Sequence, residues 1–158
     1  MEADMTIYSP VTKSTTEVIR PWYVSEEYDR QSLRINPGID LSCRSVYSIC
    51  TGCVIYIGQD TTNVNKYSVL VQYDTTHFFM YSNLVDTAVN LNDIVSLGQL
   101  IGSADRFVHF EALQLEYNNP QLRVMIYEKT YYKIDPTSYA DGSISLSPKS
   151  NLDRFSPW

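Results

Sequence analysis

Short runs of alternating hydrophobic and polar residues recur along most of this chain, and turn-forming residues bound each run. Side chains two residues apart lie on the same face of a β-strand, so this alternation predicts strands that bury one face. No stretch of the sequence keeps the period of an amphipathic helix. The predicted strands are Ser45–Cys50, Val54–Gly58, Tyr67–Tyr73, Phe78–Ser82, Phe107–Tyr117 and Arg123–Ile134.

The connections between these runs are short and carry turn chemistry, as in Asn118-Asn119-Pro120. Strands at short intervals with such turns are typical of an antiparallel meander or sandwich. The sequence therefore predicts an all-β fold, an antiparallel β-sandwich, over residues 35–142. We expect residues 1–34 to form an irregular N-terminal arm. We expect the serine-rich residues 143–158 to form an extended C-terminal tail.

Composition limits the classes of function. A chain of 158 residues with 44% hydrophobic residues fits one globular domain that buries roughly two-thirds of its unfolded surface. Twelve basic against 18 acidic residues give a net charge of −6, which argues against nucleic acid and anionic membranes as partners. The 13 tyrosines suit half-buried strands and also suit protein interfaces, and the strand interpretation is preferred.

Three cysteines, Cys43, Cys50 and Cys53, lie close together in the sequence. Cys50-Thr51-Gly52-Cys53 resembles half of a zinc ribbon, but the sequence has no second pair, and a thioredoxin-like motif needs a βαβ context. We interpret the thiols as small buried hydrophobic groups. The acidic start of the chain is followed by no apolar run, so we expect neither a secretory signal nor a membrane-spanning helix, and synthesis in a cytoplasm.

Five short motifs follow one another in a recognisable order: Gly38-Ile39-Asp40-Leu41, Gly52-Cys53-Val54, Tyr81-Ser82-Asn83-Leu84, Gly98-Gln99-Leu100-Ile101-Gly102 and His109-Phe110-Glu111. In this order and spacing they resemble the lysostaphin-type (LytM) zinc endopeptidases. The resemblance covers about residues 35–111, and Asp135-Pro136-Thr137-Ser138-Tyr139 is similar to the closing D-P-x-x-Y element of that family. It implies a β-sandwich of the LytM, or duplicated hybrid motif, type.

The resemblance also implies which positions would hold zinc. Asp40 and His109 match two ligands, while Asn36 replaces the histidine that supplies the third. Phe107 and Asn83 replace histidines that take part in catalysis. Catalytic zinc needs three good protein ligands and an open position, and an amide oxygen suits calcium or magnesium better. We therefore expect no catalytic residue and no cofactor, and we leave weak residual metal binding open.

Each retained polar residue also has a structural interpretation. His109 shares a strand face with hydrophobic residues, so a hydrogen-bonded core histidine is preferred over a ligand. Asp40 either accepts hydrogen bonds from turn N–H groups or forms a neutralised pair with a nearby imidazole. The loop before His109, Ser103–Arg106, is shorter than in the family, which implies a shortened or reshaped substrate groove.

These features predict a pseudo-peptidase, a non-catalytic structural or binding protein. We expect a bacteriophage virion component of the tail or baseplate, made in the host cytoplasm and bound to other virion proteins in a multi-copy assembly, with peptidoglycan binding left open. The alternatives are a degenerate LytM factor that regulates a cell-wall amidase, or an active peptidoglycan endopeptidase completed by a ligand such as Glu111. The expected partner-binding residues are Trp22, Tyr23, Phe155 and Trp158. Alternatively, both terminal segments cover edge strands of their own sandwich.

Overall fold

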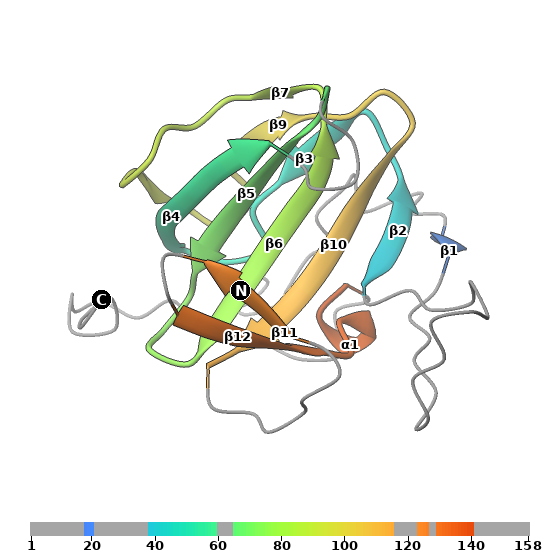
Figure 1. Ribbon diagram of the computed structural model, residues 1–158. Helices are drawn as coiled ribbons and strands as arrows, with labels where there is room; N and C mark the ends of the chain where they lie inside the picture. The colour runs from blue at the N-terminus through green and yellow to red at the C-terminus, as the bar shows by residue number, and fades with distance from the viewer. Residues whose placement is uncertain (1–17, 21–37, 60–64, 116–122, 127–128, 141–158) are drawn as a thin grey trace, which may run out of the picture.

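The computed structural model describes residues 18–20, 38–59, 65–115, 123–126 and 129–140. These residues form antiparallel strands and one helical turn, which confirms the all-β prediction (Figure 1). The elements are β1 Val18–Arg20, β2 Ile39–Ser42, β3 Ser45–Tyr47, β4 Gly52–Gln59, β5 Tyr67–Gln72, β6 His77–Leu84, β7 Asp86–Thr87, β8 Ile94–Val95, β9 Leu100–Ser103, β10 Phe107–Gln114, β11 Arg123–Ile126, β12 Lys129–Ile134 and α1 Thr137–Ala140.

In the described part of the chain, a large sheet has the strand order β1-β2-β10-β6-β5-β4-β8, and a small sheet has the order β3-β9-β7. Strand β10 is central, because β6 pairs along one of its edges and both β2 and β12 pair along the other. Strand β2 pairs with residues 107–110, and β12 pairs with residues 112–114. Strand β11 then pairs with β12 as a hairpin.

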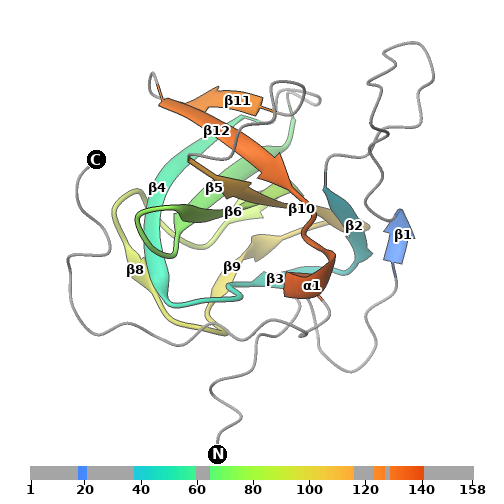
Figure 2. The ribbon, with the colours of Figure 1, turned by 90° about the horizontal axis from the view of Figure 1, so that it is seen from below.

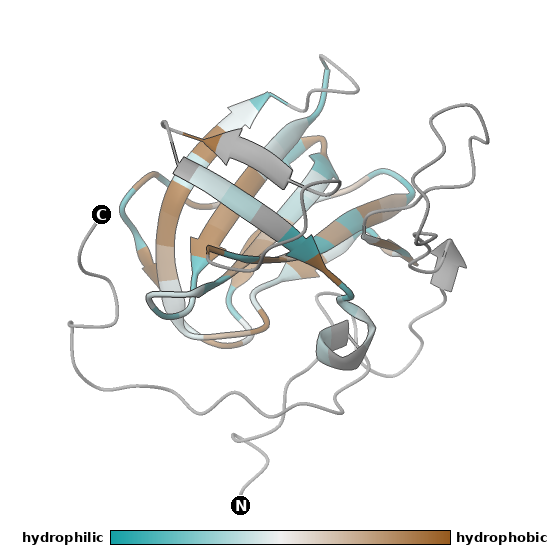
Figure 3. Cartoon of the chain, turned by 60° about the horizontal axis from the view of Figure 1, so that its bottom comes forward, coloured by the Kyte–Doolittle hydropathy of each residue, from teal (hydrophilic) through white to brown (hydrophobic). Residues whose placement is uncertain are grey.

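The main core lies between the two sheets, which makes the fold a sandwich. Val71, Tyr81 and Phe110 of the large sheet and Val46 and Ile101 of the small sheet are all fully buried in it. In Figure 2 the small sheet and the β11–β12 hairpin lie on opposite sides of β5, β6 and β10. Hydrophobic residues (brown in Figure 3) are concentrated in the strands of the large sheet.

A second, smaller core lies on the outer face of the large sheet, under the hairpin. It contains Leu70, Phe78 and Leu113 from the sheet and Tyr131 from β12. The rings of Phe78 and Tyr131 meet edge to face, with centroids 4.9 Å apart. Further along the same face, β10 carries His109 and Glu111 instead of hydrophobic residues. The outer face of β10 therefore passes from a hydrophobic core to a polar site.

The closing motif at residues 135–139 completes the main core. Oδ1 of Asp135 accepts a hydrogen bond from the backbone N–H of Thr137 at 2.9 Å, at the start of α1. Tyr139 is buried, and its ring meets that of Phe79 with centroids 5.1 Å apart. The one-turn helix thus fixes an aromatic anchor in the core. Among the described residues, no helix has the length and apolar character needed to cross a membrane.

The structure corrects several details of the strand prediction. The run Arg123–Ile134 is two strands, β11 and β12, because alternation has the same period before and after a chain reversal. The strands β2, β7, β8 and β9 were missed because two to four residues show too little alternation. Part of the predicted N-terminal arm, β1, pairs with β2.

The cysteines match the prediction in part. Cys50 is buried, whereas Cys43 and Cys53 are half-buried, and all are free thiols. Burial raises the pKa of Cys43 to about 11 and also raises the pKa of Cys53. Thiols with a raised pKa are poor nucleophiles and poor metal ligands at neutral pH, so a structural role fits them.

Candidate functional site

Two of the residues that the sequence singled out lie opposite each other on neighbouring strands. The register of β2 and β10 pairs Asp40 with His109. Nδ1 of His109 lies 2.6 Å from Oδ1 of Asp40, and the Asp40 residue is only 2% exposed. The neutralised pair that we considered for Asp40 is therefore present.

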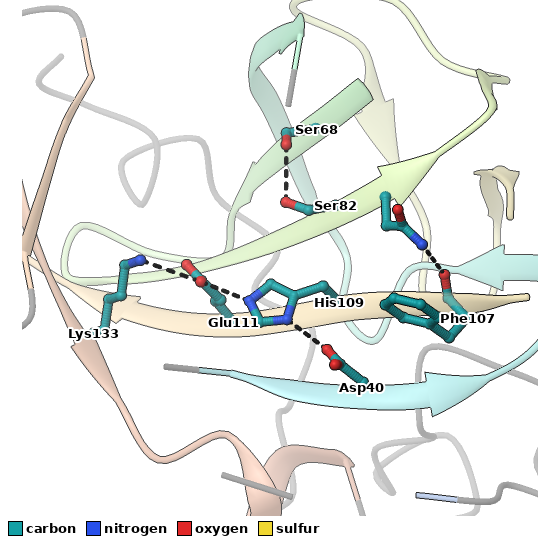
Figure 4. Close-up of polar contacts among 8 residues, drawn as sticks. Asp40, Ser68, Ser82, Phe107, His109, Glu111 and Lys133 are labelled. Carbon is teal, nitrogen blue, oxygen red and sulfur yellow. Dashed lines mark hydrogen bonds and ion pairs between the residues drawn. The ribbon is translucent and has the colours of Figure 1, made fainter. Parts of the chain in front are cut away.

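A second carboxylate binds the other nitrogen of the same ring. Glu111 lies two residues further along β10 on the same face, and its Oε2 is 2.8 Å from Nε2 of His109. Nζ of Lys133, from β12, donates to the same Oε2 at 3.2 Å. A continuous row of hydrogen bonds and ion pairs crosses three strands and joins Asp40, His109, Glu111 and Lys133 (Figure 4). These four residues are called the polar cluster below.

The electrostatics of the polar cluster favour the charged forms of His109 and Glu111. Burial by itself would lower the pKa of His109, but hydrogen bonds with Asp40 and Glu111 and their negative charges raise that pKa to about 9. Burial would raise the pKa of Glu111, but His109 and Lys133 hold it below its usual value. At neutral pH these shifts favour an imidazolium at His109 and a carboxylate at Glu111, so each of the two groups stabilises the charge of the other.

Gly38, which directly precedes β2, packs closely against two side chains of the polar cluster. A Cβ atom added to Gly38 would lie 2.8 Å from Cε1 of His109 and 2.8 Å from Cγ of Glu111. Contacts under 3 Å are too short for carbon atoms, so a side chain here would displace the imidazole or the carboxylate. The glycine of the G-I-D-L motif is therefore required for this packing.

On the other side, small hydroxyl groups border the polar cluster. Ser82 of β6 is paired in register with His109, and its hydroxyl lies 2.8 Å from that of Ser68 in β5. Both serines are buried. Figure 4 shows this hydroxyl pair on the strands next to the Asp40–His109–Glu111 row. Each hydroxyl thus has a protein partner without a ligand.

Phe107 and Asn83, which the resemblance matches to catalytic histidines of the LytM family, are joined by a hydrogen bond. Nδ2 of Asn83 donates to the backbone oxygen of Phe107 at 2.9 Å. Asn83 has a φ of 68°, a left-handed conformation that asparagine adopts more readily than most residues. The side chain of Asn83 therefore holds the end of β6 against the start of β10. Neither an amide nor a phenyl ring can transfer a proton as a histidine does.

The polar cluster does not fit a catalytic zinc ion. A histidine ligand must offer a nitrogen lone pair, whereas both nitrogens of His109 are already hydrogen-bonded to carboxylates. Separations of 2.6 and 2.8 Å are direct hydrogen bonds, which leave no room for an ion between these atoms. Over the described ranges, no group of three or more histidine, cysteine, aspartate or glutamate residues is arranged to hold a metal. Asn36 lies outside these ranges, and the absence of a cofactor stays a prediction.

The short connection between β9 and β10 is held in place by contacts with neighbouring segments. Only residues 104–106 separate β9 from β10. Nζ of Lys66, just before β5, lies 2.8 Å from Oδ2 of Asp105 in this connection. The backbone N–H of Ala104 also donates to the oxygen of Arg44 at 2.8 Å. The connection is thus held to neighbouring segments on both sides.

Sequence reasoning missed Lys133, Ser68 and Ser82. Lys133 belongs to a different strand from its partner, and its local sequence carries no motif, so no sequence signal could have found it. His77 is half-buried at the β5–β6 turn, with Nδ1 3.0 Å from Oδ1 of Asp74. The expected partner-binding residues lie outside the described ranges: Trp22, Tyr23, Phe155 and Trp158.

No protein-family model and no curated protein matches the chain by sequence. Solved structures do match its fold. A chain of the SpoIIQ–SpoIIIAH pore-forming complex aligns with a TM-score of 0.64 and 18% identity, covering 89% of this chain and 94% of that one. The chain has the lysostaphin-type peptidase fold.

Two catalytic domains support that statement. The catalytic domain of lysostaphin from Staphylococcus simulans aligns with a TM-score of 0.54 and 17% identity, over 80% of this chain and 91% of that domain. A mutant catalytic domain of the prophage-encoded protein EnpA from Enterococcus faecalis aligns with a TM-score of 0.59 and 15% identity, over 84% of this chain and 97% of that domain. The expected LytM-type sandwich is therefore confirmed as a fold.

Proposed function

We propose that this chain is a non-catalytic structural or binding protein built on a peptidase fold. One observation carries the proposal: both ring nitrogens of His109 are held by carboxylates, so the best remaining zinc ligand is already occupied. The replacement of catalytic histidines by Phe107 and Asn83 supports it, because metal-dependent hydrolysis also needs groups that transfer protons.

The direct test is metal analysis of the purified chain together with an assay on bacterial cell walls. We expect substoichiometric zinc and no cleavage of peptidoglycan cross-links, with or without added zinc. A lysostaphin catalytic domain, assayed in parallel, shows that the substrate is intact. One tightly bound zinc per chain, with wall cleavage that a chelator abolishes, would sink the proposal and favour the active endopeptidase.

More specifically, we propose a bacteriophage virion component of the tail or baseplate, with other virion proteins as partners. Two observations support this assignment. One structural neighbour, EnpA, is prophage-encoded. A peptidase-like fold without catalytic activity also suits the part of a virion that contacts the cell wall. Such a fold can bind peptidoglycan without cleaving it. Fold alone does not establish function, so the assignment needs its own test.

Mass spectrometry of purified particles from cells that carry this gene tests the virion assignment. We expect the chain in the particles at a fixed, multiple copy number, together with tail or baseplate proteins. Its recovery only in the cell fraction, cross-linked to cellular proteins, would exclude the virion assignment.

A cellular assembly protein is the second candidate, and one observation favours it. The similarity to a chain of the SpoIIQ–SpoIIIAH complex covers nearly all of that chain, so the same fold serves in a pore-forming protein complex. A degenerate LytM factor that regulates an amidase belongs to this class. Recovery of an amidase or a membrane-complex protein as the cross-linked partner would support it.

A further inference from the structure

We propose that residues 143–147 of one copy of this chain pair as a strand with the outer edge of β4 in a second copy. The sequence of this segment, which lies outside the described residues, reads S-I-S-L-S, and Pro148 follows it. Alternation with period two places Ile144 and Leu146 on one face of a strand, and a proline is typical of a strand boundary. The contact goes beyond the proposed function, because it requires neither a virion protein nor a cell wall.

The outer edge of β4 is the acceptor. In the described part of the chain, β8 pairs with β4 only at Gly52 and Cys53, and the loop before β8 reaches Val54. The order of the large sheet ends at β8, so no described strand lies beside residues 55–58 on that side. Charged residues and prolines commonly protect such edges, and β4 has neither. Its backbone is therefore suited to pairing with a further strand.

Apolar side chains flank this edge on both faces of the sheet. Ile55 and Tyr56 are half-buried against the second core, and Ile57 is half-buried against the main core. A bulge follows Val54, and beyond it β4 keeps a regular register with β5. An added strand would thus meet an extended backbone. Its two apolar side chains would cover half-buried apolar neighbours on one face.

Charge does not oppose this contact. The chain has a net charge of −6, so two copies repel each other in general. Neither β4 nor residues 142–148 contain a charged residue. The contact therefore pairs two neutral segments and adds no like-charge repulsion of its own.

Chain length favours a second copy over the same copy. Helix α1 ends at Ala140 and follows β12, which pairs with β10. Figures 1 and 2 both show α1 near β2 and β10, on the opposite side of β6 from β4. A strand beyond β4 lies four strand spacings from β10, about 19 Å. The chain from Ala140 to Ser143 spans at most about 10 Å, so this segment does not reach the edge of its own β4.

The experiment compares full-length chains by sedimentation equilibrium and by amide hydrogen exchange, at low and high protein concentration. The test variant carries Ile144→Ser and Leu146→Ser, which remove the apolar face of the segment and lie outside the described residues. The matched control carries Phe155→Ser and Trp158→Ser. It removes two apolar side chains from the same tail but leaves the S-I-S-L-S run intact.

We expect the parent and the control to associate as the concentration rises, and the test variant to remain a monomer. In the parent, the outward-pointing amides among residues 55–58 should exchange about tenfold more slowly when about 90% of the copies are paired, because only unpaired copies exchange. The test variant should exchange fast there at both concentrations. A parent chain that stays a monomer overturns the inference, and so does a test variant that associates as the parent does.

Slow exchange at residues 55–58 that does not depend on concentration would show that the same copy covers this edge, which also overturns the inference. A synthetic peptide of residues 142–148 separates the contact from the rest of the tail. Added to the test variant, it should restore slow exchange at residues 55–58. The peptide that carries Ile144→Ser and Leu146→Ser should not, and equal effects of the two peptides would contradict the proposed pairing.

Discussion

His109 shows how strongly the role of one side chain depends on its hydrogen-bond partners. Its place in a strand, two residues after Phe107, resembles that of a zinc ligand in the peptidase family. In this chain two carboxylates raise its pKa to about 9 although burial opposes the charge, so the ring is a cation at neutral pH. A cationic imidazole offers no lone pair to a metal, whereas it stabilises buried carboxylates next to it.

We predict that the free energy of unfolding decreases at alkaline pH and that His109 causes this decrease. The folded pKa is raised from 6.5 to about 9, so its stabilising effect is complete below pH 6.5 and is lost as pH rises through 9. The lowered pKa of Glu111 acts in the opposite sense, because its stabilising effect is lost as pH falls below the usual range for glutamate. At about 1.4 kcal/mol per pKa unit, the contribution of His109 is on the order of 3 kcal/mol.

Urea unfolding from pH 5 to pH 10 measures this effect. The parent chain should lose free energy of unfolding between pH 6.5 and pH 9, and His109→Gln should lack that decrease. His77→Gln is the matched control, because His77 also lies near a carboxylate but outside the polar cluster. An alkaline decrease of equal size in His109→Gln and the parent would contradict the proposed charge state.

At the scale of elements, β10 organises the molecule. Its residues 108, 110 and 112 face the main core, while Leu113 belongs to the second core and His109 and Glu111 to the polar cluster. Strands β2 and β12 share one of its edges, which brings Asp40 and Lys133 to the two ends of one chain of ion pairs. The site thus depends on the hairpin as much as on the motif-bearing strands.

Truncation of Tyr131 tests this dependence. Tyr131 is 1% exposed and packs edge to face on Phe78, so Tyr131→Ala should cost about 3–5 kcal/mol of stability, as for other large buried aromatic residues. The loss should also weaken amide-exchange protection in β12, since the hairpin loses its main anchor. Tyr67→Ala is the control, because Tyr67 is 40% exposed and should cost about 0.5 kcal/mol or less. Equal costs for the two variants would show that the hairpin adds little to the fold.

At the scale of the whole molecule, the described sandwich carries its own core and includes residues 18–20 as β1. We propose that the rest of residues 1–34, together with residues 143–158, supplies the partner contacts. Their aromatic residues, Trp22, Tyr23, Phe155 and Trp158, are of the types that dominate binding energy at interfaces. Deletion of residues 143–158 should abolish incorporation into the particle and leave the thermal midpoint unchanged. A truncated chain that assembles normally but melts earlier would show that the tail stabilises its own sandwich.

The sequence by itself determined the fold class and its type. Alternation of hydrophobic residues is a local property, so it located the long strands Gly52–Gln59 and Tyr67–Gln72 to within a few residues. The order of five short motifs indicated the peptidase fold. The motifs also predict a loss of catalysis, because a substitution such as Phe107 or Asn83 removes a functional group whatever the surroundings, and that loss stays a prediction.

Only the tertiary structure decided which partners the polar residues of these motifs bind. The partners Asp40 and His109 are 69 residues apart, Asn83 and Phe107 are 24 apart, and Glu111 and Lys133 are 22 apart. Hydrogen bonds and ion pairs act over a few ångströms, so such contacts depend on strand register and on which edge each strand takes. Lys133 reaches Glu111 because β12 takes the remaining edge of β10, a pairing that no local pattern records.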